Sequence, residues 1–176
     1  NGTGFFVSRQ GHVLTNYHVA TGAPKLILFG IASQIRPGIP VDVVWSSPQH
    51  DLAVLLPKTA LDVIPLALFD ATAIKGSEVT AIGYPAGSFS ILASLKASNL
   101  DDLLESTFTR GIVSKTFEGR FDQDPVELIQ HTSPIRPGNS GGPLLNECGQ
   151  VVGINTLFYR FGNDQGGGSA FISVAS

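Results

Sequence analysis

Hydrophobic residues along the chain occur in short runs, mostly of about four to seven residues, separated by polar turns. The 176 residues include 20 glycines and 11 prolines, which are spread throughout and mark the turns. This pattern predicts an all-β protein built of short strands. The predicted strands are Gly4–Ser8, His12–Asn16, Lys25–Phe29, Val41–Ser46, Leu52–Leu56, Glu78–Ile82, Thr107–Lys115, Leu128–Thr132, Pro143–Leu145, Val151–Leu157 and Ala170–Val174. Short strands in this number favour two six-stranded antiparallel barrels over one sandwich of two sheets.

The two predicted barrels divide the chain into nearly equal halves of a single domain. The segment Asp70–Ser77 follows an apolar stretch and precedes a new strand, so it is the expected crossover. We therefore expect an N-terminal barrel over residues 1–70 and a C-terminal barrel over residues 71–176.

One segment departs from the β pattern. Apolar residues recur at near-helical spacing within residues 90–108, namely Ile91, Leu92, Leu95, Leu100, Leu103, Leu104 and Phe108. Such a stripe is typical of a short surface helix packed on a barrel. A lid or regulatory loop is the alternative interpretation.

The charge balance argues against several classes of partner. The net charge is −3, from 11 basic and 14 acidic residues, and no basic cluster provides a surface for nucleic acid or an anionic membrane. There is no apolar run long enough to cross a membrane and no signal-peptide pattern, so we interpret the chain as an excised or processed domain. The single Cys148 cannot form an internal disulfide and leaves the redox compartment open.

Two further site classes have weak support. The four histidines lack the short spacings of metal ligands, and we expect no metal and no cofactor. The glycine clusters at residues 2–4 and 166–168 lack the lysine and the strand-helix alternation of nucleotide-binding loops.

A glycine-flanked serine is the strongest local signal. Ser140 lies within Arg136–Pro143, a turn that reads RPGNSGGP. The glycines allow successive N–H groups to point at one place, as stabilisation of a tetrahedral oxyanion requires. We expect Gly138 and Ser140 to supply these N–H groups, and a plain turn between strands is the alternative.

A serine hydroxyl needs a neighbouring base, and histidine is the side chain suited to this near neutral pH. His18 follows the apolar run that ends at Tyr17 and is the preferred candidate. His12 falls in a predicted turn, His50 precedes an acidic residue, and His131 falls on a predicted strand.

The base in turn needs a buried carboxylate that orients it. Asp51 opens the apolar run LAVLL, where an unpaired charge would be costly, so we expect it to have a partner. A turn residue that caps a strand is the alternative interpretation of Asp51. Asp42 and Asp62 lie in less apolar stretches and are weaker candidates.

The order of the three residues, together with their surroundings, resembles a known family. Histidine, aspartate and serine follow one another as in the chymotrypsin barrels. The chain is similar to the high-temperature-requirement (HtrA or Deg) branch of the trypsin-like serine proteases along nearly its whole length. The resemblance is carried by TGFFV and LTNYHV near the start, HDLAVL at residue 50, AIGYP at residue 81, GIVS at residue 111, PGNSGGPL at residue 137 and VVGINT at residue 151.

The resemblance implies a chymotrypsin-like double barrel and a role for each matching position. His18 would be the general base, Asp51 the orienting carboxylate and Ser140 the nucleophile. The backbone of Gly138, Asn139 and Ser140 would form the oxyanion hole. Thr156, Leu157 and Phe158 would pair with an extended substrate by strand addition. A specificity pocket without charged residues would be lined by Pro134, Ile135, Asn155, Gly168, Ser169 and Ala170.

We therefore expect a serine endopeptidase that acts on unfolded or extended polypeptides, with small or medium aliphatic residues before the cleaved bond. The alternative is a peptide-binding or chaperone-like scaffold with weak catalysis. The resemblance favours an extracytoplasmic location, in the periplasm, in an organelle or outside the cell. We expect the chain to begin at what resembles the family's second strand and to include no peptide-binding PDZ module, so a homo-oligomer is possible but is not supported by this chain.

Overall fold

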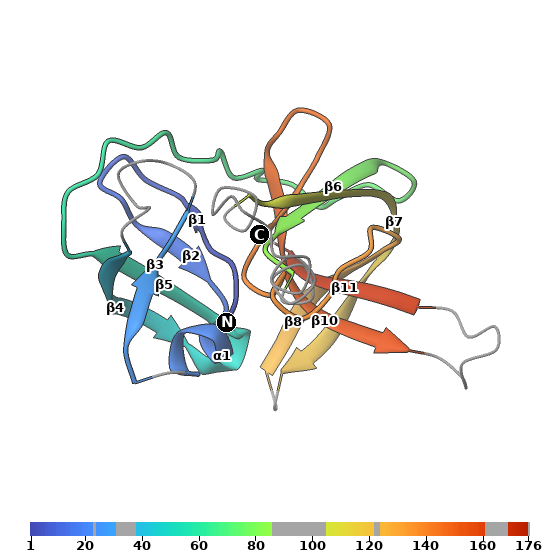
Figure 1. Cartoon of the computed structure of the whole chain (residues 1–176). Helices are drawn as coiled ribbons and strands as arrows, with labels where there is room; N and C mark the ends of the chain where they lie inside the picture. Colours follow the sequence, from blue (N-terminus) through green and yellow to red (C-terminus); the bar gives the residue numbers. More distant parts are fainter. Residues whose placement is uncertain (23, 31–37, 86–104, 122–123, 161–168, 176) are drawn as a thin grey trace, which may run out of the picture.

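Two curled antiparallel sheets, one from each half of the chain, make up the structure (Figure 1). It is a computed structural model that describes residues 1–22, 24–30, 38–85, 105–121, 124–160 and 169–175. The first sheet has five strands in the order β1-β2-β5-β4-β3. Its strands are β1 (Phe5–Phe6), β2 (Val13–Thr15), β3 (Leu26–Leu28), β4 (Ile39–Ser47) and β5 (Leu52–Pro57).

Short helical turns connect strands of the first sheet at two points. The helix α1 (Tyr17–Thr21) follows β2, and the 3-10 helix η1 (Pro48–His50) joins β4 to β5. Residues in β5 alternate between partly exposed and buried, as expected for a strand with one face on a core. The buried core of this sheet is small and consists of Val13, Ala20, Val41, Ala53 and Leu55.

The second sheet closes into a barrel in the order β10-β11-β8-β7-β6-β9. Its strands are β6 (Glu78–Gly83), β7 (Thr107–Phe121), β8 (Asp124–His131), β9 (Pro143–Leu145), β10 (Val151–Arg160) and β11 (Ser169–Ala175). Inward-facing residues fill the barrel with a larger core of Ala73, Val79, Ala81, Val113, Ile129, Ile135, Leu144 and Val152.

A third apolar cluster lies between the two sheets. Phe5 from β1 packs with Val151 and Ile154 from β10. Partly buried residues from both halves surround them, among them Leu14 and Leu52 from the first sheet. This shared cluster fixes one sheet against the other.

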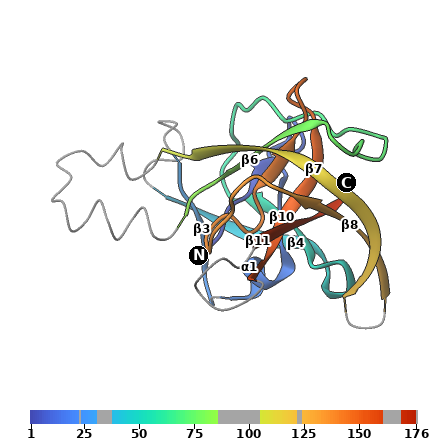
Figure 2. The same ribbon diagram turned by 90° about the vertical axis from the view of Figure 1, so that its right-hand side faces the viewer.

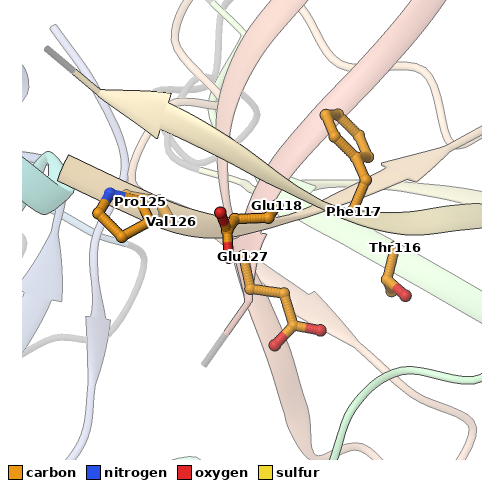
Figure 3. A pocket seen from close by; sticks show the side chains of 6 residues that line it. All are labelled: Thr116, Phe117, Glu118, Pro125, Val126 and Glu127. Carbon is orange, nitrogen blue, oxygen red and sulfur yellow. The ribbon is translucent and has the colours of Figure 1, made fainter. Parts of the chain in front are cut away.

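The strands β7 and β8 form a hairpin that is longer than the sequence predicts (Figure 2). The ladder runs on to the pair Phe121 and Asp124, whereas the predicted strands end at Lys115 and begin at Leu128. One face of this extension is polar, since Glu118 and Glu127 are opposite each other and exposed, while Val126 on the other face is buried. A shallow hollow of about 430 Å³ lies on this hairpin (Figure 3) and is lined by Thr116, Phe117, Glu118, Pro125, Val126 and Glu127.

The all-β prediction of two curled antiparallel sheets is confirmed, with six strands in the second sheet as predicted and five described strands in the first, and each predicted strand has a counterpart among the observed ones. Most of the predicted helical segment at residues 90–108 lies outside the described residues, and its last two residues belong to β7. The predicted division after residue 70 falls on the connection between β5 and β6 and stays a prediction. None of the described helices has the length and apolar character to cross a membrane.

Candidate active site

His18 lies in the single turn of α1, which follows β2 of the first sheet. Asn16, with extended backbone angles (φ −76, ψ 150), ends β2 and starts this turn. Ala20 on the same turn is buried, so His18 is on the opposite, accessible side. The imidazole is about half exposed, at 51% of its side-chain area. Its position on a short, anchored turn leaves one ring edge open to a reacting group.

Asp51 ends η1 in the left-handed backbone region, with φ 52 and ψ 41. It is the single described non-glycine residue with positive φ, a conformation that aspartate tolerates better than most residues do. Its N–H donates to the Pro48 carbonyl, and its own carbonyl accepts from Tyr17 N–H at 3.0 Å and from Asn16 Nδ2 at 2.9 Å. These bonds tie the connection that carries Asp51 to the connection that carries His18.

The carboxylate of Asp51 is hydrogen-bonded to both the imidazole and the backbone N–H of His18. His18 Nδ1 lies 2.8 Å from Oδ2 and 3.0 Å from Oδ1, and the His18 backbone N–H donates to Oδ1 at 3.0 Å. Thr156 Oγ1, from the second sheet, donates to Oδ2 at 2.8 Å. Burial by itself would raise the pKa of Asp51, but the hydrogen bonds from His18 and Thr156 outweigh it and lower the pKa below its ordinary value. Asp51 is therefore held as a carboxylate that orients the imidazole.

Ser140 lies in the turn between β8 and β9. Its Oγ is 3.4 Å from the carbonyl oxygen of Thr156, a long contact for a hydroxyl donor. No hydrogen bond joins it to the imidazole among the described residues. Thr156 nevertheless contacts both Asp51 through its hydroxyl and Ser140 through its carbonyl. One residue of β10 thus brings the predicted serine, aspartate and histidine into a single cluster.

The turn around Ser140 has a defined set of used and free N–H groups. Asn139 N–H donates to the Arg136 carbonyl at 2.9 Å, and Gly141 N–H donates to the Asn155 carbonyl at 2.8 Å. Within the described part of the chain, the N–H groups of Gly138 and Ser140 have no acceptor. Gly138 has φ 102, a conformation that favours glycine. The free donors are thus those of Gly138 and Ser140, while that of Asn139 is already used.

The other histidines and acids that could compete for these roles are placed elsewhere. His12 Nδ1 pairs with Ser8 Oγ, and His50 Nδ1 pairs with Ser47 Oγ, each at 2.7 Å. Asp42 is exposed on β4 beside Lys58, at 3.1 Å. None of these pairs includes Ser140, His18 or Asp51.

His131 is enclosed in the second barrel. It is 1% exposed and lies between Val113 on β7 and Phe171 on β11 in the strand register. Burial lowers the pKa of His131 to about 4, which keeps it neutral at ordinary pH. It is therefore a core residue of the second barrel.

Residues 2–154 match the model of the trypsin-like peptidase domain. The chain belongs to the trypsin-like peptidase family. Its relatives include HtrA- and DegP-type proteases, as the resemblance implied, and the prediction of a trypsin-like peptidase is confirmed at the level of the family.

Curated relatives and solved structures give the same family. This trypsin-like domain is 38% identical over 160 residues to the "Probable periplasmic serine endoprotease DegP-like" of Hahella chejuensis, covering 90% of the chain and 30% of that relative. It is also 38% identical over 169 residues to "Protease Do-like 1, chloroplastic" of Arabidopsis thaliana, covering 33% of that relative. The chain thus spans about a third of the length of these relatives.

Among solved structures, "HtrA-type protease AlgW with decapeptide" superposes with a TM-score of 0.71 and 29% identity. It is matched over 99% of this chain and 48% of its own. The MamO protease domain of Magnetospirillum magneticum has a TM-score of 0.74 at 21% identity, which shows the shared fold.

The predicted specificity residues of this trypsin-like domain are placed in different ways. Pro134 is exposed, and its carbonyl accepts from Thr109 Oγ1 at 2.7 Å. Ile135 is 4% exposed and packs in the barrel core. Asn155 is fully buried, and its side-chain amide donates to the Pro143 carbonyl at 3.2 Å. The assignment of these residues to a specificity pocket stays a prediction.

The remaining predicted substrate residues belong to β10 and to the start of β11. Thr156, Leu157 and Phe158 lie on β10, where the ladder to β11 shifts register between Asn155 and Leu157. Ser169 and Ala170 begin β11, and Gly168 lies outside the described residues.

Sequence reasoning missed the hydroxyl groups that support the site. The Thr156 hydroxyl on Asp51 was not foreseen, because Thr156 was assigned to the substrate edge alone. The Thr3 hydroxyl donates to the Gly138 carbonyl at 2.7 Å across 135 positions of sequence. The one available signal was that both residues lie within motifs of the family resemblance.

Proposed function

We propose that this trypsin-like domain hydrolyses peptide bonds of extended polypeptides with Ser140 as nucleophile, His18 as general base and Asp51 as orienting carboxylate. The observation that carries the proposal is the contact of Thr156 with both Asp51 and Ser140. These two contacts link side chains that come from both halves of the chain. They lie next to the N–H groups of Gly138 and Ser140, which have no acceptor among the described residues. Such a combination serves acyl transfer and has no use in a plain turn between strands.

Each group has one task in the reaction. A turn of the Ser140 side chain away from the Thr156 carbonyl would direct Oγ to His18 Nε2, which takes the hydroxyl proton as Oγ bonds to the substrate carbonyl carbon. Asp51, on Nδ1, favours the tautomer with Nε2 free and stabilises the imidazolium that forms. His18 then gives the proton to the leaving amine, and water releases the acyl group in a second, equivalent step.

The negative oxygen of the tetrahedral intermediate would be held by the N–H groups of Gly138 and Ser140. Both belong to a turn fixed by hydrogen bonds at its other N–H groups, so they are aligned before the substrate arrives. Preorganised donors of this kind stabilise the transition state more than the ground state.

We extend the proposal to the substrate class. An extended peptide would pair with the backbone of residues 156–158, and a small or medium aliphatic side chain would precede the cleaved bond. The AlgW structure was solved with a decapeptide, which supports a peptide substrate here. The periplasmic and chloroplastic relatives support an extracytoplasmic or organellar location.

Hydrolysis of unfolded casein tests the proposal. We expect cleavage by the wild-type domain and a loss of about 10⁶-fold in kcat for Ser140→Ala, because removal of a serine nucleophile costs about this much in a related chemistry. Ser77→Ala removes an exposed hydroxyl outside the site and should cleave like the wild type. Casein that is bound but not cut by the wild-type domain would favour a peptide-binding scaffold, and unchanged cleavage by Ser140→Ala would refute the assignment.

A further inference from the structure

Thr3 lies just before β1, and four hydrogen bonds converge on it. Its N–H donates to the Ser140 carbonyl at 2.8 Å, and its Oγ1 donates to the Gly138 carbonyl at 2.7 Å. The same Oγ1 accepts from Tyr84 N–H at 3.0 Å, and the Thr3 carbonyl accepts from Thr15 Oγ1 at 2.6 Å. Thr3 is 5% exposed, so a group that lost its partner here could not easily turn to water instead.

The two bonds from Thr3 fix alternate peptide planes of the serine turn. A carbonyl and the next N–H share one plane and point in opposite directions. Thr3 holds the Gly138 carbonyl on one side, and Arg136 holds the Asn139 N–H of the same plane on the other. This plane therefore cannot flip without breaking bonds at both of its ends.

The peptide plane between Ser140 and Gly141 is fixed in the same way. Thr3 holds the Ser140 carbonyl, and Asn155 accepts from the Gly141 N–H of the same plane. The N–H groups of Gly138 and Ser140, which have no acceptor among the described residues, belong to the planes that alternate with these two, and the plane between Asn139 and Ser140 is itself held at its carbonyl, which accepts from Gly142 N–H at 2.9 Å. The bonds of the turn thus leave without an acceptor the two donors that an oxyanion would need.

Close packing supports this arrangement. Gly141 has φ 84, and a Cβ atom there would collide with the Thr3 carbonyl oxygen and with Thr15 Oγ1. The serine turn therefore rests directly on the strand segment that carries Thr3.

We propose that Thr3 is a positioning residue of the first sheet that sets the oxyanion-binding shape of the serine turn in the second. The inference rests on the proposed function, since it concerns how Gly138 and Ser140 are aligned. It adds a second link across the two sheets, besides the bond between Thr156 and Asp51, and this link acts on the nucleophile side of the reaction.

The test compares Thr3→Val, which removes the hydroxyl at nearly constant shape, with Thr3→Ser, which restores it. The probe is a peptide boronic acid: Ser140 Oγ bonds to boron, its proton passes to His18, and the resulting tetrahedral anion mimics the intermediate. We expect Thr3→Val to lose about tenfold or more in boronate affinity and in kcat, with KM nearly unchanged. Thr3→Ser should return both to within about twofold of the wild type.

A control variant separates positioning from general stability. Thr107→Val removes a hydroxyl that donates to the Gly83 carbonyl at 3.1 Å, outside the serine turn, and should leave boronate affinity unchanged. Thr3→Val that binds the boronate like the wild type would overturn the inference, even if it melted at a lower temperature. Loss of boronate binding in Ser140→Ala would at the same time show that the proposed function stands.

Hydrogen exchange on the wild-type domain gives a test that needs no variant to fold. The N–H groups of Asn139 and Gly141 should exchange slowly in the free domain, because both are bonded. Those of Gly138 and Ser140 should exchange quickly and become protected when the boronate binds. Equal protection of all four in the free domain would contradict the alternating arrangement.

Discussion

The two sheets differ in closure and in what they contribute to the site. The first sheet is open, with five strands and a core of five small or medium aliphatic residues. It leaves Val43, Val44 and Trp45 of β4 about half exposed. The second sheet is a closed barrel with eight buried core residues. The less enclosed half nevertheless carries both the predicted base and its carboxylate.

This difference shows where the site gains its rigidity. The first sheet has only a small core. There, Asn16 and Tyr17 on the connection after β2 donate hydrogen bonds to the carbonyl of Asp51 on the connection before β5, and these bonds hold the two connections together. In the second, a closed barrel supports a glycine turn in which three consecutive peptide planes, from Gly138 to Gly141, are held by hydrogen bonds. The halves meet through the cluster around Phe5 and through the bonds of Thr3 and Thr156, so neither half completes the site alone.

Among the variants that compare the two sheets, substitution of Asp51 in the first sheet should have the largest effect, and this effect is on kcat. Asp51→Asn keeps the shape of the side chain but places an amide beside His18 Nδ1. The amide favours the wrong imidazole tautomer and lacks the negative charge that would stabilise the imidazolium. We expect kcat to fall by about 10⁴-fold, equivalent to about 5 kcal/mol. Casein hydrolysis measures it, with Asp42→Asn, an exposed acid on β4, as the matched control. A loss below about tenfold in Asp51→Asn would mean that the first sheet does not supply the orienting group.

The cluster between the sheets should have the next largest effect. Phe5→Ala opens a cavity against Val151 and Ile154, and we expect the free energy of unfolding to drop by about 3–5 kcal/mol. Phe108→Ala, at a site that is 66% exposed, should change it by less than about 0.5 kcal/mol. Denaturant titration measures both. Similar losses for the two variants would show that the halves are not held together by the shared cluster.

The smallest of these effects concerns the second barrel and depends on pH. The pKa of His131 is about 4 in the folded domain and has its ordinary value of 6.5 in the unfolded chain. Between these two pH values the unfolded chain therefore binds a proton on His131 that the folded domain does not bind. Stability is therefore complete above about pH 6.5 and falls as the pH drops towards 4, by about 3 kcal/mol in all. Denaturant titrations at a series of pH values should show this fall.

His131→Leu should flatten the fall in stability between pH 6.5 and 4, while His12→Gln, in the first half, should keep it. Asp51 contributes in a different window, since a lowered pKa loses its stabilising effect only below the ordinary value of 3.8. An unchanged slope in His131→Leu would mean that the barrel does not hold this histidine neutral.

Much of the fold could be predicted because burial leaves a clear pattern. Strands with a pronounced apolar run, such as LAVLL in β5, were placed within a few residues. The outer part of the β7 and β8 hairpin was missed, because Glu118, Arg120 and Glu127 make one face polar and Gly119 and Pro125 interrupt the apolar pattern around the buried Val126. Pairing there depends largely on continuation of the backbone ladder.

The site divides in the same way between local and long-range signals. The residues chosen from local motifs include His18 and Asp51, which are in contact, and Ser140, which contacts Thr156; their catalytic roles stay predictions. The roles of Thr3 and Thr156 depend on contacts across 135 and 105 positions of sequence, which no local pattern reveals. The use of Asn139 N–H within the turn likewise becomes visible only from the backbone geometry.

Labelling with a fluorophosphonate, followed by mass mapping of the modified peptide, tests the central claim most directly. The reagent reports a hydroxyl activated by a base, so the account predicts stoichiometric labelling of Ser140 in the wild-type domain. It also predicts that labelling slows by several orders of magnitude in His18→Ala. Label on another residue, or equally fast labelling of Ser140 in His18→Ala, would contradict a site assembled from both sheets.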